Sequence, residues 1–529
     1  MNFTSGLIDG IIFGGVLTCF FAGITSGRLM AILQQGGYSG KRFLKWYCGK
    51  GNIQRKRLSL LSLALVLLIA LFNVCFSFAG FKIANLVSIL PFVGLFLLYL
   101  ISEKKYALKV PVNVTPRLKR LIVANVIVLF FVSIGLGFGL AGISLAIDAE
   151  WFYLLRFVPF ALLPIVLPFT LICANGVMLV YEIPHNNAFI SRAKKTLDNA
   201  KCVKVGITGS FGKTSVKNFA AQMLGTKYKV IATPSSFNTP MGIARTVNEQ
   251  GLDCDIFLAE MGARHLGDIA ELCDLVEPEY GIVTGVCEQH IETFGSLENI
   301  KKEKSVLAKR VRKKAVLGKT CDFPVENALR EDVEFALKEL VCTKDGISFT
   351  LNLEGKEIAM RSALLGKHTA EDIALAAALC HLLGMSLEEI ARAVETLKPV
   401  PHRLQKIEAN GRTILDDSYN CNIEGAKNAV ETLKLFDGKK IVVTPGIVEL
   451  GTLEEALNEK LGAELVGLDV ILVGETLVLP VRKGYLDAGG DEANLKVVPT
   501  LEKAQEILAK ELEEGDTVLF LNDLPDIYR

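Results

Sequence analysis

The stretch Thr208-Gly209-Ser210-Phe211-Gly212-Lys213-Thr214-Ser215 decides the fold of the chain around it. It follows an apolar run, residues 202–207, that is typical of a β-strand, and it precedes residues 216–224, whose apolar side chains recur at helical spacing. Glycines let backbone N–H groups converge on an anion, and a helix N-terminus adds partial positive charge. The pattern predicts a phosphate-binding turn in which Lys213 reaches the terminal phosphates and Thr214 or Ser215 holds Mg²⁺. Its spacing departs from the standard P-loop, because Ile207 stands where that motif has its first glycine.

Composition divides the chain into an apolar first third and a more polar remainder. Hydrophobic residues make up 50% of the 529 residues, and their excess lies before about residue 182. The net charge of +1 creates no field that would attract nucleic acid, so no nucleic-acid partner is expected. The 12 cysteines include no C-x-x-C pair, which indicates reduced thiols in a cytosolic or membrane-buried setting.

Five apolar runs before residue 182 have the length of about 20 residues that a bilayer requires. They are approximately Leu7–Ile24, Leu58–Phe78, Ile83–Ile101, Leu121–Ala146 and Leu154–Tyr181. Lys and Arg gather after the first and third runs, whereas the segments after the second and fourth are nearly free of them. The positive-inside rule therefore predicts five spans of the cytoplasmic membrane, with the N-terminus outside and everything after Tyr181 in the cytoplasm. Because no charged residue lies deep in a span, an anchor and docking surface is favoured over a transporter.

After the predicted transmembrane domain, 1–182, comes a polar linker, 183–200, which we expect to run as a basic helix along the inner membrane surface. From Val203 strands and helices alternate, which predicts a mostly parallel sheet covered on both faces. The expected strands are Val203–Thr208, Lys229–Ala232, Ile256–Glu260 and Tyr280–Val286. Shorter strands such as Ile347–Leu353 and a helix, His368–Leu383, complete a central domain at 201–400.

A second α/β pattern fills the predicted C-terminal domain, 401–529. Pro399 and Pro401 mark the linker before it. Its expected strands are Thr413–Asp416, Lys440–Thr444, Val470–Val473, Lys496–Val498 and Thr517–Leu521. The predicted fold is therefore multi-domain: a five-helix transmembrane domain, an α/β P-loop-type ATPase domain and a Rossmann-like α/β domain.

Several polar residues follow strand ends, where open α/β sheets place ligand groups. Glu260 ends one strand and can serve as a second protein ligand to Mg²⁺, although a solvated carboxylate would explain it equally well. His290 lies beyond another strand end, and a lone histidine is more often structural than metal-binding. On their own, Lys304 indicates a solvated helix lysine and residues 416–422 a turn.

The order of these motifs resembles the Mur ligase family, and most closely its D-alanyl-D-alanine-adding members. The resemblance is carried by Thr208–Thr214, Asn238–Gly242, Glu260–Asp268, His290–Ser296, Gly366–His368, His402-Arg403 and Asp416–Asn422. It implies an enzyme that uses ATP to phosphorylate a substrate carboxylate, after which an amine attacks the acyl phosphate. The implied cofactors are ATP and two Mg²⁺ ions.

The resemblance also assigns roles to individual residues. The stretch from Thr208 to Ser215 would bind the phosphates, with Lys213 on the β and γ groups, and Thr214 with Glu260 would hold one Mg²⁺. His290 is similar to the ligand of the second Mg²⁺, and Lys304 aligns with a lysine that such enzymes carbamylate beside that metal. Arg403 and Asp417 look like the C-terminal contribution to phosphate and ribose, and His368 lies in the adenine-side motif. The implied catalytic residues are Lys213, His290, Lys304 and Arg403.

The departures from the family shape the expected function. Thr369 and Asp372 stand where the adenine-side motif has asparagines, and Val306 stands where the carbamate helix usually has a glutamate. The five predicted spans replace the family's N-terminal uridine-nucleotide domain. We therefore expect a membrane-anchored ATP-dependent ligase that joins an amino-acid or dipeptide amine to a carboxylate cell-wall precursor, with a lipid-linked carrier sharing the membrane surface. Two alternatives stay open: the D-alanyl-D-alanine-adding reaction on a UDP-linked tripeptide, and an ATP-gated membrane transporter or sensor. The oligomeric state is open as well.

Overall fold

The computed structural model describes residues 25–49, 52–76, 89–103, 112–146, 158–288, 291–419, 421–448, 453–475 and 477–522, with a few isolated positions besides. The chain divides into two compact units, one up to His185 and one from Asn186 onward. The first unit is helical, and the second is built from helices and sheets.

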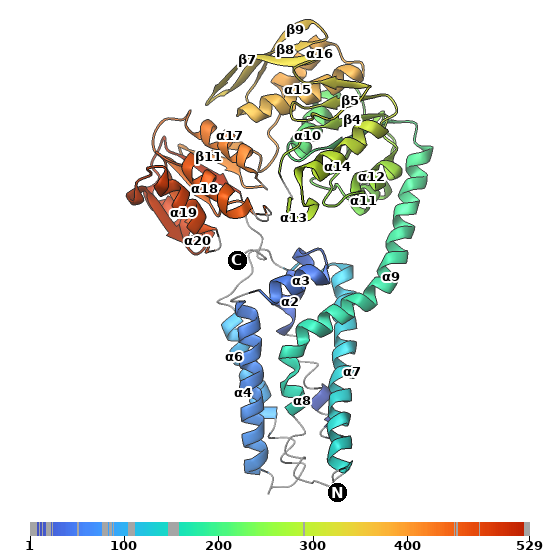
Figure 1. Ribbon diagram of the computed structural model, residues 1–529, viewed down its shortest axis with the longest axis vertical. Coiled ribbons are helices and arrows are strands. Elements are labelled where there is room, and N and C mark those ends of the chain that lie inside the picture. Colours follow the sequence, from blue (N-terminus) through green and yellow to red (C-terminus); the bar gives the residue numbers. More distant parts are fainter. Residues whose placement is uncertain are drawn as a thin grey trace. The chain divides into compact units, whose positions relative to one another are not determined.

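The helical unit agrees with the apolar composition of its sequence. Its described helices are α2 (Gly27–Gln35), α3 (Gly40–Tyr47), α4 (Ile53–Phe76), α6 (Ile89–Glu103), α7 (Pro116–Ala146), α8 (Val158–Ala161) and the first part of α9 (Leu163–Asn199) (Figure 1). Among the described residues, α7 and α9 are long and apolar enough to cross a membrane, and they match the fourth and fifth predicted spans. Helices α4 and α6 lie on the second and third, and the first lies mostly outside the described residues. A helix buried in the core of a soluble protein can be equally long and apolar, so the five-span domain stays a prediction.

Helix α9 differs from the predicted arrangement of a span followed by a separate basic helix. It continues through residues 183–200 with Pro168 and Pro184 inside it. Its last turns belong to the second unit, where Ala193 and Leu197 are buried in the core and Lys194 pairs with Glu277. Pro184 cannot make the backbone hydrogen bond of a helix interior, which costs stability. The packing of the buried residues at this end of α9 offsets that loss.

The middle domain is organised around a six-stranded sheet with the order β2-β3-β1-β4-β5-β6. Its strands are β1 (Val203–Thr208), β2 (Val230–Ala232), β3 (Ile256–Glu260), β4 (Tyr280–Val283), β5 (Lys314–Leu317) and β6 (Ala328–Arg330). Its helices are α10 (Lys213–Leu224), α11 (Pro240–Gln250), α12 (Asp268–Val276), α13 (Ile291–Phe294) and α14 (Leu297–Arg310). All neighbouring strands pair in parallel, as predicted. Strand order reverses beside β1, so the crevice at its carboxyl end is where such a sheet binds ligands.

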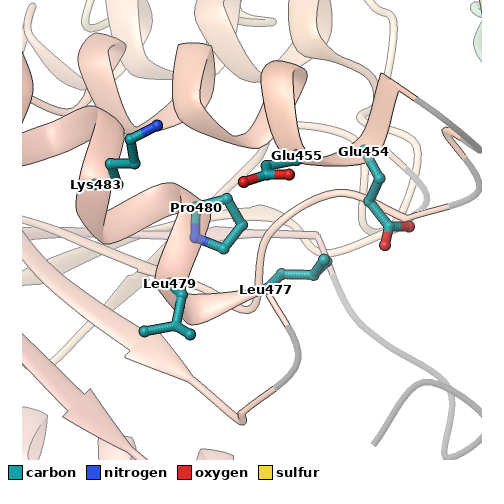
Figure 2. A pocket seen from close by; sticks show the side chains of 6 residues that line it. All are labelled: Glu454, Glu455, Leu477, Leu479, Pro480 and Lys483. Atoms are coloured by element: carbon teal, nitrogen blue, oxygen red, sulfur yellow. The ribbon is translucent and has the colours of Figure 1, made fainter.

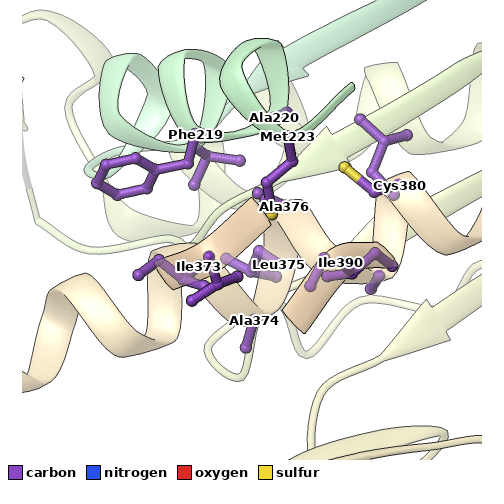
Figure 3. Close-up of a cluster of buried hydrophobic side chains, with 14 of the residues drawn as sticks. Phe219, Ala220, Met223, Ile373, Ala374, Leu375, Ala376, Cys380 and Ile390 are labelled. Atoms are coloured by element: carbon purple, nitrogen blue, oxygen red, sulfur yellow. The ribbon is translucent and has the colours of Figure 1, made fainter. Parts of the chain in front are cut away.

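Helix α10 is held in place by a second helix, α15 (Lys367–Leu382). Figure 3 shows Phe219, Ala220 and Met223 of α10 facing the alanine-rich side of α15. Alanines on α15 let the two helices approach closely and bury their shared surface. An antiparallel sheet of β7 (Phe335–Thr343), β8 (Gly346–Leu353) and β9 (Lys356–Ser362), with α16 (Leu387–Glu395), completes this core. The packing fixes the N-terminus of α15 relative to the start of α10.

The C-terminal domain contains a second six-stranded sheet with the order β10-β11-β15-β12-β13-β14. Its strands are β10 (Gln405–Ala409), β11 (Arg412–Asp417), β12 (Lys440–Thr444), β13 (Asp469–Val473), β14 (Leu495–Val498) and β15 (Thr517–Leu521). Its helices are α17 (Ile423–Leu433), α18 (Glu454–Glu464), α19 (Val478–Asp487), a short 3₁₀ turn η5 (Glu492–Asn494) and α20 (Leu501–Glu511). The five predicted strands are confirmed to within a residue at either end. The pattern missed β10, a polar edge strand that runs antiparallel to β11.

Candidate functional site

The predicted phosphate-binding turn connects β1 to α10. Gly209 and Gly212 have φ of 151° and 71°, a region that side chains with a Cβ rarely adopt. A Cβ at Gly209 would lie 2.0 Å from Thr284 Oγ1, and one at Gly212 would lie 2.4 Å from Asp372 Oδ1. Helix α10 begins at Lys213, so its first N–H groups face the turn. The turn therefore forms a tight backbone cradle that fits an anion.

The other residues of the turn hold its shape. Thr208 Oγ1 donates to the Met261 carbonyl at 2.7 Å, which ties β1 to the end of β3. The Ser210 hydroxyl accepts from the Cys287 amide at 3.2 Å, and the Phe211 carbonyl accepts from the Thr284 hydroxyl. These three predicted phosphate-binding residues connect the cradle to the neighbouring strand ends.

Lys213 is half-buried, and its ammonium lies within the cradle. Its ammonium donates to the carbonyls of Gly209 at 2.8 Å and Ser210 at 3.0 Å. Burial lowers the pKa of Lys213, while the negative charge of Glu260 opposes this shift and the positive charge of Arg403 adds to it. The ammonium thus lies at the turn itself, within reach of an anion bound there.

Glu260 ends β3 directly beside β1, and its carboxylate is surrounded by donors. Its Oε2 accepts from the Thr214 hydroxyl at 3.0 Å and from Lys217 Nζ at 3.0 Å, and its Oε1 accepts from Asn238 Nδ2 at 3.1 Å. The structure therefore brings together the two predicted Mg²⁺ ligands, Thr214 and Glu260. Their hydroxyl and carboxylate oxygens are the donors that Mg²⁺ prefers.

Lys217 is a site residue that the sequence analysis did not identify. It lies on α10 one turn after Lys213, and its side chain is 1% exposed. Burial lowers its pKa, and the ion pair with Glu260 opposes that shift. The sequence could have identified Lys217 by its position four residues after Lys213, because residues four apart share one face of a helix.

Asp372 of α15 also lies against the cradle. Ser215 hydrogen-bonds its carboxyl group, and burial raises its pKa well above the ordinary value. This residue was noted only as a departure from the family motif, yet it contacts both Gly212 and Ser215. A carboxyl group this close to bound phosphate is compatible with the anion only when it carries a proton or a hydrogen bond from a donor such as Ser215.

His368 is the second residue of α15, two positions after the N-cap Gly366, which has φ of 89°. Burial lowers the pKa of its imidazole to about 4, and the charge of Arg403 adds to the effect. Its Nδ1 is buried and has no hydrogen-bond partner among the described residues. A neutral ring with an unused nitrogen fits the polar edge of a nucleotide base.

Lys304 lies on α14 and is buried. Burial lowers its pKa to about 7, and the charge of Lys213 adds to this shift, while Glu303 and Asp268 oppose it. Glu303 itself accepts from the amides of Gly267 and Ile269, so its carboxylate holds the start of α12. A lysine near pKa 7 has a large neutral fraction at physiological pH, the form that reacts with CO₂.

Arg403 is the residue of the C-terminal domain whose charge acts on Lys213 and His368. Its guanidinium lies 4.2 Å from the centroid of the Tyr419 ring. Its two neighbours, His402 and Leu404, have φ of 61° and 46°, an uncommon conformation that concentrates at functional sites. Asp417 Oδ1 accepts from the Leu404 amide at 3.1 Å, which holds this segment in place.

Asp417 is buried at the end of β11, and its predicted contact with ribose stays a prediction. Burial raises its pKa to about 6, and the Arg403 charge opposes the shift. Its contact with the Leu404 backbone makes it the support of the segment that carries Arg403. A direct contact between the domains comes instead from Tyr419, whose hydroxyl hydrogen-bonds that of Ser236 in the middle domain.

The backbone and side-chain groups of this site fit one nucleotide phosphate and one hard cation such as Mg²⁺. The glycine cradle, Lys213, and the Thr214–Glu260 oxygens supply that fit. His290 lies outside the described residues, so the predicted second metal position is represented only by Lys304. No group of three or more His, Cys, Asp and Glu side chains in the described part of the chain could hold a metal ion on its own. Any cation at Glu260 would therefore share its coordination with the nucleotide.

A separate open pocket of about 330 Å³ lies in the C-terminal domain. It is lined by Glu454, Glu455, Leu477, Leu479, Pro480 and Lys483, from α18, α19 and the turn before α19 (Figure 2). None of the predicted site residues lines it.

Comparison with known proteins assigns both domains of the α/β unit. Residues 207–380 match the Mur ligase middle domain, and residues 402–522 match the Mur ligase, glutamate ligase domain, which together make up more than half of the chain. The chain is similar to the UDP-N-acetylmuramoyl-tripeptide–D-alanyl-D-alanine ligase of Escherichia coli, with 31% identity over 51% of this chain and 63% of the relative. The corresponding ligase of Bacillus subtilis is 30% identical over 51% of this chain and 62% of the relative. The chain thus spans somewhat less than two thirds of the length of these relatives.

Solved structures support the same assignment. The MurF ligase of Thermotoga maritima in complex with ADP aligns with a TM-score of 0.56 and 26% identity, over 64% of this chain and 80% of that one. MurF of Acinetobacter baumannii aligns with a TM-score of 0.58 at 22% identity, over 64% of this chain and 77% of that one, which supports the fold. The two matched domains, with the glycine cradle of the first and the arginine segment of the second, place this chain in the Mur ligase family.

Proposed function

We propose that the chain is an ATP-dependent, ADP-forming ligase that joins a carboxylate to an amine in peptidoglycan precursor synthesis. The observation that carries this proposal is the meeting of the glycine cradle, Lys213 and the Thr214–Glu260 pair at the carboxyl end of β1, with the charge of Arg403 acting on the same site. The relatives named UDP-N-acetylmuramoyl-tripeptide–D-alanyl-D-alanine ligase support it.

Each residue of the site has a task in such a reaction. Bound ATP would supply the phosphoryl group that activates the substrate carboxylate as an acyl phosphate. Lys213 and the amides of the cradle would bind the phosphates, and Thr214 with Glu260 would hold one Mg²⁺. Because acyl phosphate formation brings two anions together, the positive charges of Lys213 and Arg403 lower the electrostatic cost of their approach. The split of the site between two domains allows water to be excluded when both substrates are bound.

For the substrates, we propose the reaction named for the relatives: D-alanyl-D-alanine as the amine and a UDP-linked muramoyl tripeptide as the carboxylate. A lipid-linked carboxylate is the second candidate, because the helical unit lies outside the two matched domains and has an exposed apolar surface. On α4 the exposed residues Leu60, Leu63, Leu67 and Leu71 follow one face, and Leu67 is 62% exposed. On α7 Phe131 is 68% exposed.

These exposed side chains also support the proposed location in the cytoplasmic membrane. Apolar faces of this kind are stable when lipid covers them. We propose that the helical unit is the five-span anchor and that the ligase domains are cytoplasmic. A reporter fused after Arg529 should then be active only in its cytoplasmic form, and an extracytoplasmic signal would contradict the topology.

For Lys304 we propose carbamylation beside a second Mg²⁺ that His290 helps to hold. The buried position of Lys304 and its pKa of about 7 support this assignment, because the neutral amine is the reactive form. Carbamylation would replace a buried cation with an anion next to Lys213. The exchange would remove one repulsion and create a metal ligand.

The decisive experiment measures phosphate release by detergent-purified full-length protein with ATP and Mg²⁺. One reaction contains the UDP-linked tripeptide with D-alanyl-D-alanine, and the other contains a membrane lipid extract with an amino-acid mixture. Release with the first pair supports the D-alanyl-D-alanine-adding reaction, whereas release only with the second supports a lipid-linked carboxylate. ATP turnover without any ligated product in either reaction would contradict the ligase and favour a transporter or sensor.

A further inference from the structure

Lys217 is a buried cation in direct contact with the carboxylate assigned to the metal. Its Nζ lies 3.0 Å from Glu260 Oε2 and 2.5 Å from the Ser235 carbonyl. Both members of the ion pair are 1% exposed. The ammonium is therefore fixed by two acceptors inside the protein, where charge interactions are screened less than at the surface.

The surroundings of Glu260 leave a metal ion no unshared carboxylate oxygen. Thr214 and Lys217 both donate to Oε2, and Asn238 donates to Oε1. A divalent cation that binds Glu260 must share these oxygens and accept the repulsion of the nearby ammonium. Without the ammonium, Glu260 would be a buried, unpaired carboxylate, which is costly.

We propose that Lys217 neutralises Glu260 while no metal is bound, and thereby makes binding of the divalent cation depend on the nucleotide. The inference rests on the nucleotide and metal site described under the proposed function. Phosphate oxygens add negative charge and further ligands at the cradle, and these offset the repulsion by Lys217. The cation then enters as a metal–nucleotide complex, and free metal binds weakly.

The test measures Mn²⁺ binding to full-length protein in detergent by electron paramagnetic resonance, without substrates. Lys217→Gln removes the charge but keeps a hydrogen-bond donor for Glu260. Without nucleotide, this variant should bind Mn²⁺ about tenfold or more tightly than the wild type, because the repulsion is gone. Lys217→Arg should match the wild type. Equal Mn²⁺ affinity in Lys217→Gln and the wild type would overturn the proposal.

A matched control comes from Lys204, a second buried lysine in the same domain. It is 5% exposed on β1, and its ammonium donates to the Leu197 carbonyl at 3.2 Å. Lys204→Met removes a buried ammonium away from Glu260, so its affinity for free Mn²⁺ should not change. A rise equal to that of Lys217→Gln would show a general effect of losing buried charge and would contradict the inference.

A second measurement on the wild type keeps the inference testable if Lys217→Gln does not fold. In the presence of ADP, the protein should bind Mn²⁺ about tenfold or more tightly than ADP alone binds Mn²⁺ in solution. Mn²⁺ binding of equal strength with and without ADP, lost in Glu260→Gln, would overturn the role of Lys217 but leave the metal site standing. Failure of the wild type to bind Mn²⁺ or ADP in any combination would instead refute the proposed function.

Discussion

The middle and C-terminal domains share a parallel-sheet design, but their key strands end in opposite chemistry. After β1 the chain continues with two glycines, Lys213 and a hydroxyl, and these form a cradle for an anion. Strand β11 instead ends in two carboxylates, Asp416 and Asp417. Asp416 accepts from His402, and Asp417 accepts from the Leu404 amide. The first strand end forms a cradle that fits an anion, whereas the second supports the neighbouring segment that contains Arg403. Similar folds thus acquire different tasks from the few residues that follow a strand.

The largest expected effect comes from removing the cation of the first strand end. Lys213→Ala should abolish phosphate release, because a preorganised donor to the phosphates is lost. Thermal unfolding should show that the protein stays folded. ATP-dependent ligation within tenfold of the wild type would show that the cradle does not bind the phosphates.

A second effect on the middle domain tests the carbamate. Lys304→Ala should be inactive, and short carboxylates such as acetate or formate should restore part of the phosphate release by occupying the vacated position. Lys213→Ala, assayed with the same carboxylates, is the control and should show no recovery. Full activity of Lys304→Ala without added carboxylate would remove the carbamate from the mechanism.

The two domains should also respond to pH in opposite directions. In its uncarbamylated form, Lys304 has a folded pKa of about 7 against 10.5 ordinarily, so the unfolded state binds more protons between these values and stability rises with pH there. Asp417 has a folded pKa of about 6 against 3.8, so the folded state binds more protons in that window and stability falls as pH rises. Denaturation across both windows should show the first slope flattened in Lys304→Met and the second in Asp417→Asn. Unchanged slopes in both variants would contradict these shifts.

The smallest effect is expected at the contact between the domains. Tyr419→Phe keeps the ring beneath Arg403 but removes the hydroxyl that meets Ser236. The loss of one exposed hydrogen bond should change phosphate release by less than about tenfold. Ser236→Ala should have the same effect, and the double variant should add little to either. Additive losses would show that the two hydroxyl groups act independently.

The parts of the site that are local in sequence were predictable. Strands, glycines and Lys213 follow one another along the chain, so residues 203–224 indicate strand, cradle and helix together. The contacts of Lys217 and Asp372 were missed because they depend on the packing of α10 against β3 and α15. The prediction divided helix α9 after residue 182 for a related reason, since the buried side chains against which its last turns pack lie in another part of the sequence.

The place of β15 has a consequence for biosynthesis. This strand is the last one along the chain, yet it lies between β11 and β12 in the C-terminal sheet. Until residues 517–521 leave the ribosome, the inner edges of both strands lack their partner, and the domain exists as two unjoined halves. Arg403 can therefore be presented to the cradle only after synthesis of the domain is nearly finished. A premature stop before Thr517 would leave two open sheet edges, which are a template for aggregation.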